Sequence, residues 1–592
     1  MARMPCRKPE KNMLDKVLDF ARDTGITSEP GFAAKSARWA ITCNSEGKYT
    51  GVLPLAEGKQ ARQFGCCPNL AQSEMIAGGI TRSQFLIDSL QNVVLYLKEG
   101  ATEKEVAKAE TKHQFFITLL KQSGEQIPSL RAIALLLNDK EQLHQIREEL
   151  AQLSPKPKPI DNVTFRVDGD LVLDADSWHT WWRAFRRGLL RDNQKPAAKK
   201  TIQMRCLLSG ELIEPAKTHK AKIKRLPGGL STGDALIGFD KAAFQSFGLD
   251  KSENAATSEE TATLYAETLN HLIQENSTRF GDLSVAHWFS HSVQDEDDIF
   301  STLQNPETPE PGVESLPRKL LRSIQSGKRE DLANNHYYAL TLSGASGRVM
   351  VRDWMEGQFS ELIQHIDQWF CDLAIVARDG KRLAPLPKFL AVAGSTERDL
   401  GDVPPPLMLQ LYKAAMNGLA FPQSAKAKAL LRTRIHIIQD EPISHAGMGL
   451  IKAYQIRNKG DQHMGTHLNP DHPEPAYQCG RLLALLARLQ RSALGDVGAG
   501  VVQRYYSAAS QTPALTIGRL MSNAKNHLSK LDGGLQHWYE NQIADVMACI
   551  DSSIPKTLDL EKQSLFALGY YQQIAKLNAG KDKTTDNQGE NA

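Results

Sequence analysis

The sequence predicts a multidomain α+β protein, in which mixed α/β N-terminal and central regions are followed by an all-α C-terminal helical bundle. At 592 residues the chain is longer than one hydrophobic core supports, so we expect roughly three to four domains. Apolar and polar residues alternate, as they do in strands, within 38–55, 162–175 and 336–354. In the first and the last of these ranges a turn divides the pattern into two strands, which predicts a hairpin in each. Beyond residue 404 the apolar residues recur at helical spacing, which predicts amphipathic helices.

Breaks in this periodicity mark the expected domain boundaries. Alternating prolines favour an extended linker at 154–160, and more prolines interrupt the pattern at 305–317. Within the first region, Ser83 is the expected N-cap of a helix over 83–97. The expected segments are a disordered extension at 1–12, a mixed α/β domain at 13–100, a helical segment and linker at 101–160, a basic α/β region at 161–305, a second α/β region at 306–402, a helical connector at 403–463, the helical bundle at 464–579 and a disordered tail at 580–592. Translation from Met1 and from Met13 both stay open.

Composition limits the class of protein. The chain is 41% hydrophobic and 23% charged, as globular proteins are, and it lacks the apolar run of about 18 residues that a membrane helix needs. We therefore expect a soluble, cytoplasmic protein. The eight cysteines are scattered, which argues against a disulfide scaffold and a structural zinc. Phosphate-binding loops, serine-hydrolase elbows, zinc-protease helices and kinase loops are all missing, so we predict no catalytic residues, no metal and no cofactor.

Basic residues are concentrated between Trp181 and Arg225. This tract holds thirteen Lys or Arg and three acids, although the whole chain carries a net charge of only +3. At helical spacing, Arg183, Arg186 and Arg187 share one face, with Trp178 and neighbouring aromatics largely on another. Such a tract is typical of proteins that bind a phosphate backbone, whereas the alternative is a solvated helix face and loop.

Five longer strings resemble one known family. They are CLLSGELIEPAKTHKAKIKRLPGG from Cys206, ALTLSGASGRVMVRDW from Ala339, TRIHIIQDEPISHAGMGLIKAY from Thr433, YQCGRLLALLARLQ from Tyr477 and RYYSAASQTPALTIGRLMSNAKNHLSKL from Arg504. In order and over most of the chain, these strings are similar to the large subunit of the type I-C CRISPR Cascade surveillance complex, the Csd family of CRISPR-associated proteins.

The resemblance implies a non-catalytic subunit of an RNA-guided antiviral complex. Its partners would be the guide RNA, the backbone, guide-processing and small subunits of Cascade, target duplex DNA with its displaced single strand, and a helicase-nuclease that it helps to recruit. Base pairing to the guide reads the target sequence, so the protein itself needs to read only a short protospacer-adjacent motif and the backbone shape.

The family's motif-sensing element lies in the N-terminal domain, here 13–100, and the loop at 60–82 is the candidate. The residues expected to read base edges are Asn69, Gln72 and Ser73. The residues expected to bind phosphates are Lys59, Arg62, Arg82, Arg183, Arg186, Arg187, Arg191, Lys199, Lys200, Lys220, Lys222, Lys224 and Arg225. The alternative is that 60–82 is an ordinary polar surface loop.

The C-terminal bundle supports a further expectation from the family, in which an internal translation start yields a separate small subunit. Met464 precedes the bundle, so the product would be residues 464–592, with Met448 as a competing start. The basic residues expected to bind the displaced strand are Arg481, Arg488, Arg491, Arg504, Arg519, Lys525 and Lys530. The alternative is that Met464 is an ordinary loop residue.

Two other classes of protein stay open from the sequence. One is a nucleic-acid-processing enzyme, such as a metal-dependent nuclease, that uses Asp or His residues outside the known motifs. The other is a protein-interaction scaffold whose basic tract binds acidic partners.

Overall fold

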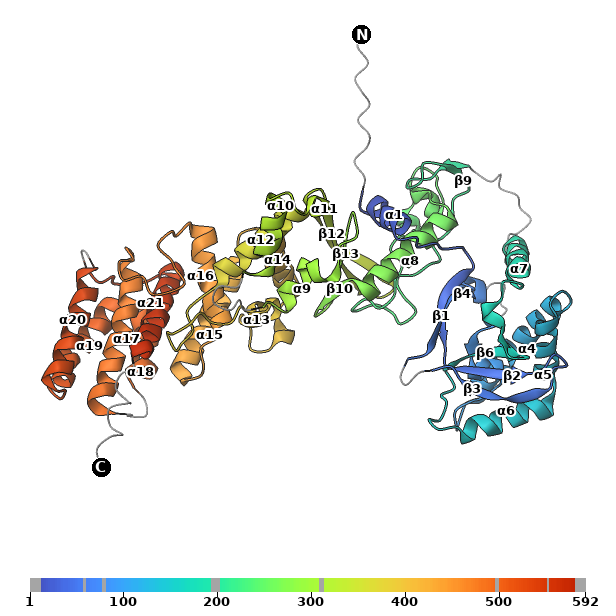
Figure 1. The fold of residues 1–592 in the computed structure, drawn as a ribbon, viewed down its shortest axis with the longest axis horizontal. Coiled ribbons are helices and arrows are strands. Elements are labelled where there is room, and N and C mark those ends of the chain that lie inside the picture. The colour runs from blue at the N-terminus through green and yellow to red at the C-terminus, as the bar shows by residue number, and fades with distance from the viewer. Residues whose placement is uncertain are drawn as a thin grey trace, which may run out of the picture. The chain divides into compact units, whose positions relative to one another are not determined.

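The computed structural model describes residues 12–56, 60–76, 81–192, 203–307, 314–495, 500–550 and 553–580. The chain forms two compact units. Unit 1 comprises Met1–Asn276 and Ser343–Val351, and unit 2 comprises Ser277–Leu342 and Arg352–Ala592. Sheets lie in the N-terminal and central regions and the C-terminal region is helical, so the predicted fold class is confirmed (Figure 1).

A mixed sheet forms the centre of unit 1. Its strands lie in the order β3 (Tyr49–Pro54), β2 (Trp39–Cys43), β6 (Asn162–Val167) and β5 (Asp88–Ser89), with β7 (Asp170–Leu171) also paired to β6. β2 and β3 form the predicted hairpin, whereas β2 and β6 are parallel. A parallel pair requires a long crossover, and the helices between β3 and β6 supply it.

Three helices pack on this sheet, α4 (Glu103–Gly124), α5 (Pro128–Asn138) and α6 (Lys140–Gln152) (Figure 1). The helical segment expected within 101–160 is therefore confirmed. Thr102 begins α4 with a capping box, in which its hydroxyl accepts from the Glu105 N–H and the Glu105 carboxylate accepts from the Thr102 N–H. The core between helices and sheet contains Phe116 and Phe165, whose ring centroids are 6.0 Å apart.

The remaining elements of unit 1 are mostly short. They are α1 (Met13–Asp23), β1 (Phe32–Ala37), β4 (Arg62–Pro68), α2 (Gln72–Met75), α3 (Leu90–Val93), η2 (Val172–Asp174), α7 (His179–Asp192), β8 (Met204–Arg205), β9 (Leu212–Ile213), η3 (Ala242–Phe244), η4 (Lys251–Ala255) and α8 (Glu259–Glu275). β1 and β4 form a separate antiparallel pair.

The prediction of a helix over 83–97 is wrong. Only the four residues of α3 are helical there, and Ser83 is buried upstream of them and caps no helix. Leu86 has a φ of +58°, which no helix tolerates, and its carbonyl accepts from the Thr164 hydroxyl at 3.0 Å. Pairing with β6 thus draws the segment out of the helical conformation that its apolar spacing favours.

Unit 2 begins with an antiparallel sheet and continues as helices. The sheet has the order β10 (Ser277–Phe280), β11 (Leu283–Phe289), β12 (His336–Ala345) and β13 (Arg348–Gln358), so the hairpin predicted at 336–354 is confirmed. The tip of this hairpin, Ser343–Val351, belongs to unit 1. The helical elements are η5 (Asp295–Asp297), α9 (Ile299–Gln304), α10 (Leu316–Gln325), α11 (Glu330–Ala333), α12 (Phe359–Leu373), α13 (Phe389–Gly394), η6 (Leu400–Asp402), α14 (Pro405–Met416), α15 (Gln423–Gln439), α16 (His445–Lys459), α17 (Pro475–Leu494), α18 (Val501–Gln511), α19 (Pro513–Leu528), α20 (Gly533–Ala548) and α21 (Leu560–Ala579).

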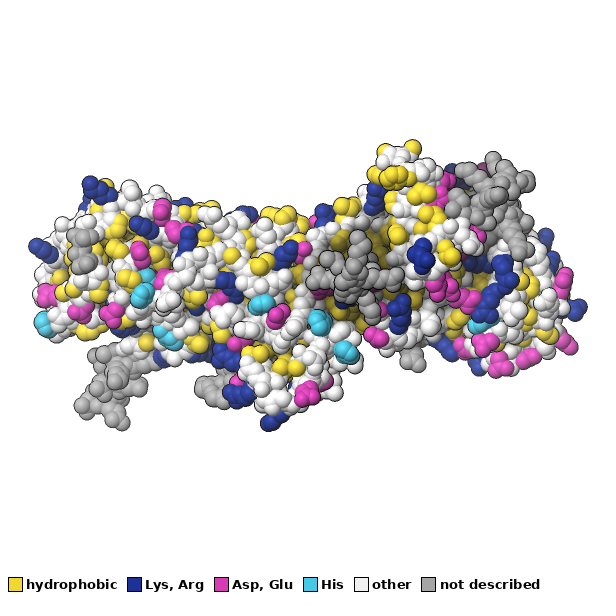
Figure 2. All heavy atoms as spheres, turned by 90° about the horizontal axis from the view of Figure 1, so that it is seen from above, with side chains coloured by type: hydrophobic (Ala, Val, Ile, Leu, Met, Phe, Trp, Pro, Cys, Tyr) yellow, Lys and Arg dark blue, Asp and Glu magenta, His cyan; other side chains and the backbone are white. Residues whose placement is uncertain are grey.

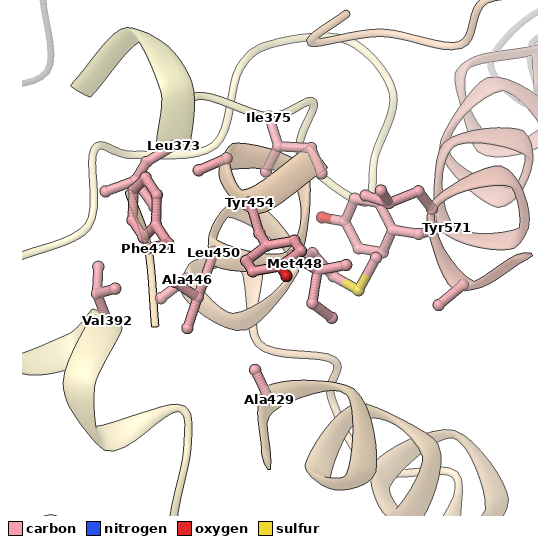
Figure 3. Close-up of a cluster of buried hydrophobic side chains, with 14 of the residues drawn as sticks. Leu373, Ile375, Val392, Phe421, Ala429, Ala446, Met448, Leu450, Tyr454 and Tyr571 are labelled. Carbon is pink, nitrogen blue, oxygen red and sulfur yellow. The ribbon is translucent and has the colours of Figure 1, made fainter. Parts of the chain in front are cut away.

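One hydrophobic core extends through unit 2, and α16 lies inside it. Met448 and Tyr454 on this helix lie beside Tyr571 of α21 (Figure 3). α17 and α21 approach each other closely at two glycines. A Cβ on Gly480 would lie 2.0 Å from the Phe566 carbonyl oxygen, and one on Gly569 would lie 2.1 Å from that of Tyr477. Only glycine permits this approach.

None of the helices in the described part of the chain combines the length and the apolar character that crossing a bilayer requires.

Candidate nucleic-acid interface

A polar pocket of about 530 Å³ lies in unit 1. Its walls come from the start of β1, the 69–76 segment that includes α2, one residue of α7, the 218–224 segment and the first half of α8. It gathers five of the residues predicted from the sequence, namely Asn69, Arg186, Lys220, Lys222 and Lys224. The predicted motif-reading loop and the predicted basic tract therefore meet at one site.

The aromatic face of α7 fixes the position of Arg186. Trp178 and Trp182 are buried, and the Trp182 indole N–H donates to the Gly31 carbonyl at 2.7 Å. Gly31 has a φ of +93°, and a Cβ there would lie 2.5 Å from Cδ of Arg186. Glycine is required at this position both for the backbone conformation and for the path of the arginine side chain.

Four charged side chains form a cluster in the pocket, which we call the ionic quartet: Glu74, Arg186, Lys220 and Glu259. Oε1 of Glu74 accepts from Nη2 of Arg186 and from Nζ of Lys220, both at 3.0 Å. Oε1 of Glu259 accepts from the same two groups, at 2.6 and 2.9 Å. Burial raises the pKa of Glu259, but the charges of Arg186 and Lys220 outweigh it and hold that pKa below its usual range.

The quartet ties α2, α7, α8 and the 218–224 segment together. The second oxygen of Glu74 accepts from the Ala71 N–H at 2.8 Å, which caps the start of α2. Nη1 of Arg82 donates to the Glu74 carbonyl at 2.9 Å. Arg82 and Arg186 are only 6% and 9% exposed. Their prediction as phosphate-binding residues is corrected here, because their guanidinium groups serve internal acceptors.

Two residues that sequence reasoning missed hold the loop that carries Asn69. The Gln84 side chain accepts from the Leu70 N–H at 2.8 Å and donates to the Leu70 carbonyl at 2.9 Å. Lys35 donates to the Gln84 side chain at 3.0 Å, and loss of water around its ammonium group lowers the pKa of Lys35 to about 8. The Asn69 N–H donates to the Gly31 carbonyl at 2.8 Å. No local pattern in the sequence indicates these long-range contacts.

A buried histidine also lines the pocket. His219 is 5% exposed, and its Nδ1 lies 2.7 Å from the Tyr265 hydroxyl. Burial lowers the pKa of His219 to about 4, so the ring is uncharged at neutral pH. Its Nε2 has no hydrogen-bond partner among the described residues. The pocket thus contains a buried polar atom that a ligand or a water molecule can satisfy.

The pocket is lined by equal numbers of basic and acidic side chains. The lining includes the cations Arg186, Lys220, Lys222 and Lys224 and the acids Glu74, Asp240, Glu259 and Glu267. Lys222 and Lys224 make no ion pair with any described residue, and Lys224 is exposed. The pocket therefore offers two available ammonium groups for phosphates, beside donors and acceptors of the kind that base edges need.

Other predicted phosphate-binding residues lie outside this pocket. Arg62 is exposed and pairs with Asp174 at 2.9 Å. Arg183 is exposed on α7 and donates to both carboxylate oxygens of Glu29, which lowers the pKa of that glutamate. Arg187 and Arg225 are also exposed. Lys59, Lys199 and Lys200 lie outside the described residues, as do the side chains of Gln72, Ser73 and Arg191.

Basic side chains do not form one continuous patch on the face that Figure 2 shows. Lys and Arg side chains there lie interleaved with Asp and Glu side chains.

The basic residues predicted in the C-terminal bundle differ in their exposure to solvent. Arg481 is 5% exposed and donates to Gln573, Pro470 and Gln478, so its prediction as a strand-binding residue is corrected. Arg488 is half-buried on α17. The exposed members of the set are Arg491, Arg504, Arg519, Lys525 and Lys530. Met464 lies between α16 and α17 and is itself buried.

Among the described residues there is no group of three or more His, Cys, Asp or Glu side chains that is arranged to hold a metal ion.

The fold and the pocket define a large α+β protein with a charge-balanced pocket in its first unit. The family model described as CRISPR-associated protein (Cas_Csd1) matches residues 14–578, and the chain belongs to that family. The resemblance found in the sequence is thereby confirmed, and the chain is a CRISPR-associated component of a Cascade complex. None of the curated proteins matches the chain.

Proposed function

We propose that this chain is the non-catalytic large subunit of a type I-C Cascade, and that unit 1 binds duplex DNA beside the guide-matched target and reads a short protospacer-adjacent motif there. The observation that carries the proposal is the convergence of Asn69 with Lys222 and Lys224 on one pocket. The lysines supply phosphate contacts that position the duplex, while Asn69 offers an amide to a base edge.

The ionic quartet supports this division of roles. Because Arg186 and Lys220 are already paired with carboxylates, they contribute little to phosphate binding. They keep α2 in place instead. Specific recognition requires side chains on a rigid support, and the quartet supplies that support for the loop at 69–76.

The proposal is tested by measuring duplex affinity of the full chain across a salt series. Each lost phosphate contact lowers the slope of log affinity against log salt by about 0.9, so Lys222→Ala with Lys224→Ala lowers it by about 1.8. Lys217→Ala is the matched control, because Lys217 directly precedes the 218–224 segment, is exposed and does not line the pocket. An equal fall in slope for the control contradicts the assignment of the site.

A metal-dependent nuclease is the competing class. Cleavage of DNA by the isolated chain, abolished by a chelator, contradicts the non-catalytic part of the proposal.

We also propose that translation from Met464 yields a small subunit of residues 464–592. Met464 falls in the connection between α16 and α17, so the product contains α17 to α21 whole. The product lacks α16, however, and with it Met448 and Tyr454, which belong to the same buried core as Tyr571 (Figure 3). We therefore expect the small subunit to associate with another surface that covers this apolar face.

The internal start is tested in cells with an epitope at the C-terminus of the chain. Met464→Leu removes the start codon and conserves side-chain volume, so the short product should disappear while the long one remains. Met448→Leu is the control, because it removes the competing start. Loss of the short product with Met448→Leu alone assigns translation to the other methionine.

A further inference from the structure

A second pocket, of about 270 Å³, lies in unit 2 among the ends of α15, α17, α18 and α21. Three arginines line it, namely Arg378, Arg488 and Arg491, and we call it the arginine pocket. Arg488 and Arg491 were predicted from the sequence as basic residues of the helical bundle. Arg378 was not, because it lies far upstream in the chain.

One asparagine holds two of these arginine positions in place. The Asn578 side-chain oxygen accepts from Arg488, and its amide donates to the Arg378 carbonyl at 2.8 Å. The loop that carries Arg378 packs closely against α21 at Gly380, where a Cβ would lie 2.0 Å from the Ala575 carbonyl oxygen. Burial lowers the pKa of Arg488. The backbone at Arg378 and the Arg488 guanidinium are therefore fixed before any ligand binds.

The rest of the lining is partly apolar and partly acidic. Val501, Val502 and Ile574 contribute apolar side chains to the lining, and Asp440 and Glu441 contribute carboxylates. These carboxylates repel a simple anion. They can, however, accept from the amino and imino groups of a nucleobase, while the apolar side chains can contact the base.

We propose that the arginine pocket binds one nucleotide of single-stranded nucleic acid, with its phosphate at Arg378 and Arg491 and its base against the apolar side chains. This inference rests on the proposed function, because a single strand is displaced only where the guide pairs with one strand of a target duplex. Since Arg378, Asp440 and Glu441 all precede Met464, the pocket is complete in the full chain and incomplete in a product of residues 464–592.

The test uses the full chain and a fluorescent single-stranded DNA oligonucleotide, with affinity measured by anisotropy over a salt series. Arg378→Ala is expected to weaken binding about tenfold and to lower the salt slope by about 0.7. Arg382→Ala is the matched control, because Arg382 is exposed on the same loop, pairs with Asp379 and does not line the pocket. Unchanged affinity in Arg378→Ala, or an equal loss in the control, overturns the inference.

Three further arms identify the source of the nucleotide and separate this inference from the proposed function. In the first arm, an RNA oligonucleotide or dAMP competes with the fluorescent DNA oligonucleotide. If such a competitor displaces the DNA, and does so less well from Arg378→Ala, the pocket binds a nucleotide, and the effective competitor shows whether that nucleotide comes from RNA or is free. Competition by inorganic phosphate as effective as that by dAMP contradicts a role for the base.

Binding of motif-bearing duplex should be unaffected by Arg378→Ala. If Lys222→Ala with Lys224→Ala still weakens duplex binding while Arg378→Ala changes nothing, only the arginine pocket is refuted. If the lysine variant has no effect and Arg378→Ala does, only the proposed function of unit 1 is refuted.

Discussion

Replacing Glu74 by glutamine removes one negative charge from the ionic quartet and keeps the length of the side chain. The Glu74 side chain is 4% exposed and its partners Arg186 and Lys220 are 11% and 21% exposed. After Glu74→Gln, two largely buried cations share the single carboxylate of Glu259. We expect loss of stability, because an uncompensated charge is left out of water.

The expected magnitude follows from burial. Removing one partner of a buried ion pair costs about 3–5 kcal/mol. The lower end applies here, since Glu259 remains and Lys220 keeps some contact with water, so we expect about 3 kcal/mol. At about 1.4 kcal/mol for each factor of ten, amide hydrogens that exchange through opening of this region should exchange roughly a hundredfold faster.

Hydrogen exchange measured by mass spectrometry tests this on the full chain. Peptides of α8 should show the acceleration, whereas peptides of α17 and α21 in unit 2 report any general effect. Glu29→Gln is the matched control, because Glu29 pairs with Arg183 of the same helix α7 at an exposed site. Such exposed pairs contribute little. If Glu74→Gln accelerates exchange in α8 no more than Glu29→Gln does, the quartet does not hold these elements together.

Two further variants test the packing and the buried histidine. Gly480→Ala should lower the free energy of unfolding of unit 2, measured in urea, by about 1–3 kcal/mol, because the added methyl group clashes between α17 and α21. Gly518→Ala is the control, since Gly518 lies in α19 with open space around it, and this change should be neutral or stabilising. Equal effects of the two substitutions would contradict the close approach of α17 and α21. Between pH 6.5 and about 4, His219 is protonated in the unfolded chain but not in the folded one. The free energy of unfolding should therefore fall by about 3 kcal/mol as the pH is lowered through this range. His219→Gln should remove this contribution to the pH dependence of stability. An unchanged pH profile in His219→Gln contradicts the low pKa.

Much of the fold could be predicted from the sequence, because local periodicity decides it. The hairpin of β2 and β3 and the helices α4, α5 and α6 follow directly from alternating and helical apolar spacing. The helix expected from Ser83 failed for a physical reason. Its apolar spacing is helical, but contact with Thr164 of β6 holds Leu86 in a conformation that a helix excludes.

The candidate site could be predicted only in part. Composition and spacing indicated a basic tract and a polar loop, and the structure brings Asn69, Lys222 and Lys224 from these two segments together. The sequence could not show that Arg186 is buried, since helical spacing places it beside Arg183 and Arg187. Its two acceptors, Glu74 and Glu259, come from segments far away in the chain, and no local pattern encodes such a pairing.

The most direct test of motif reading by unit 1 is a binding measurement on the complex assembled with guide RNA and the other Cascade subunits. Target duplexes carry randomised bases beside the guide-matched sequence, and the bound fraction is sequenced at several salt concentrations. We predict enrichment of one short motif, and a change in the preferred bases with Asn69→Ala worth about 1–3 kcal/mol. Enrichment of no motif, or the same motif with the same strength in Asn69→Ala, would contradict motif reading at this pocket.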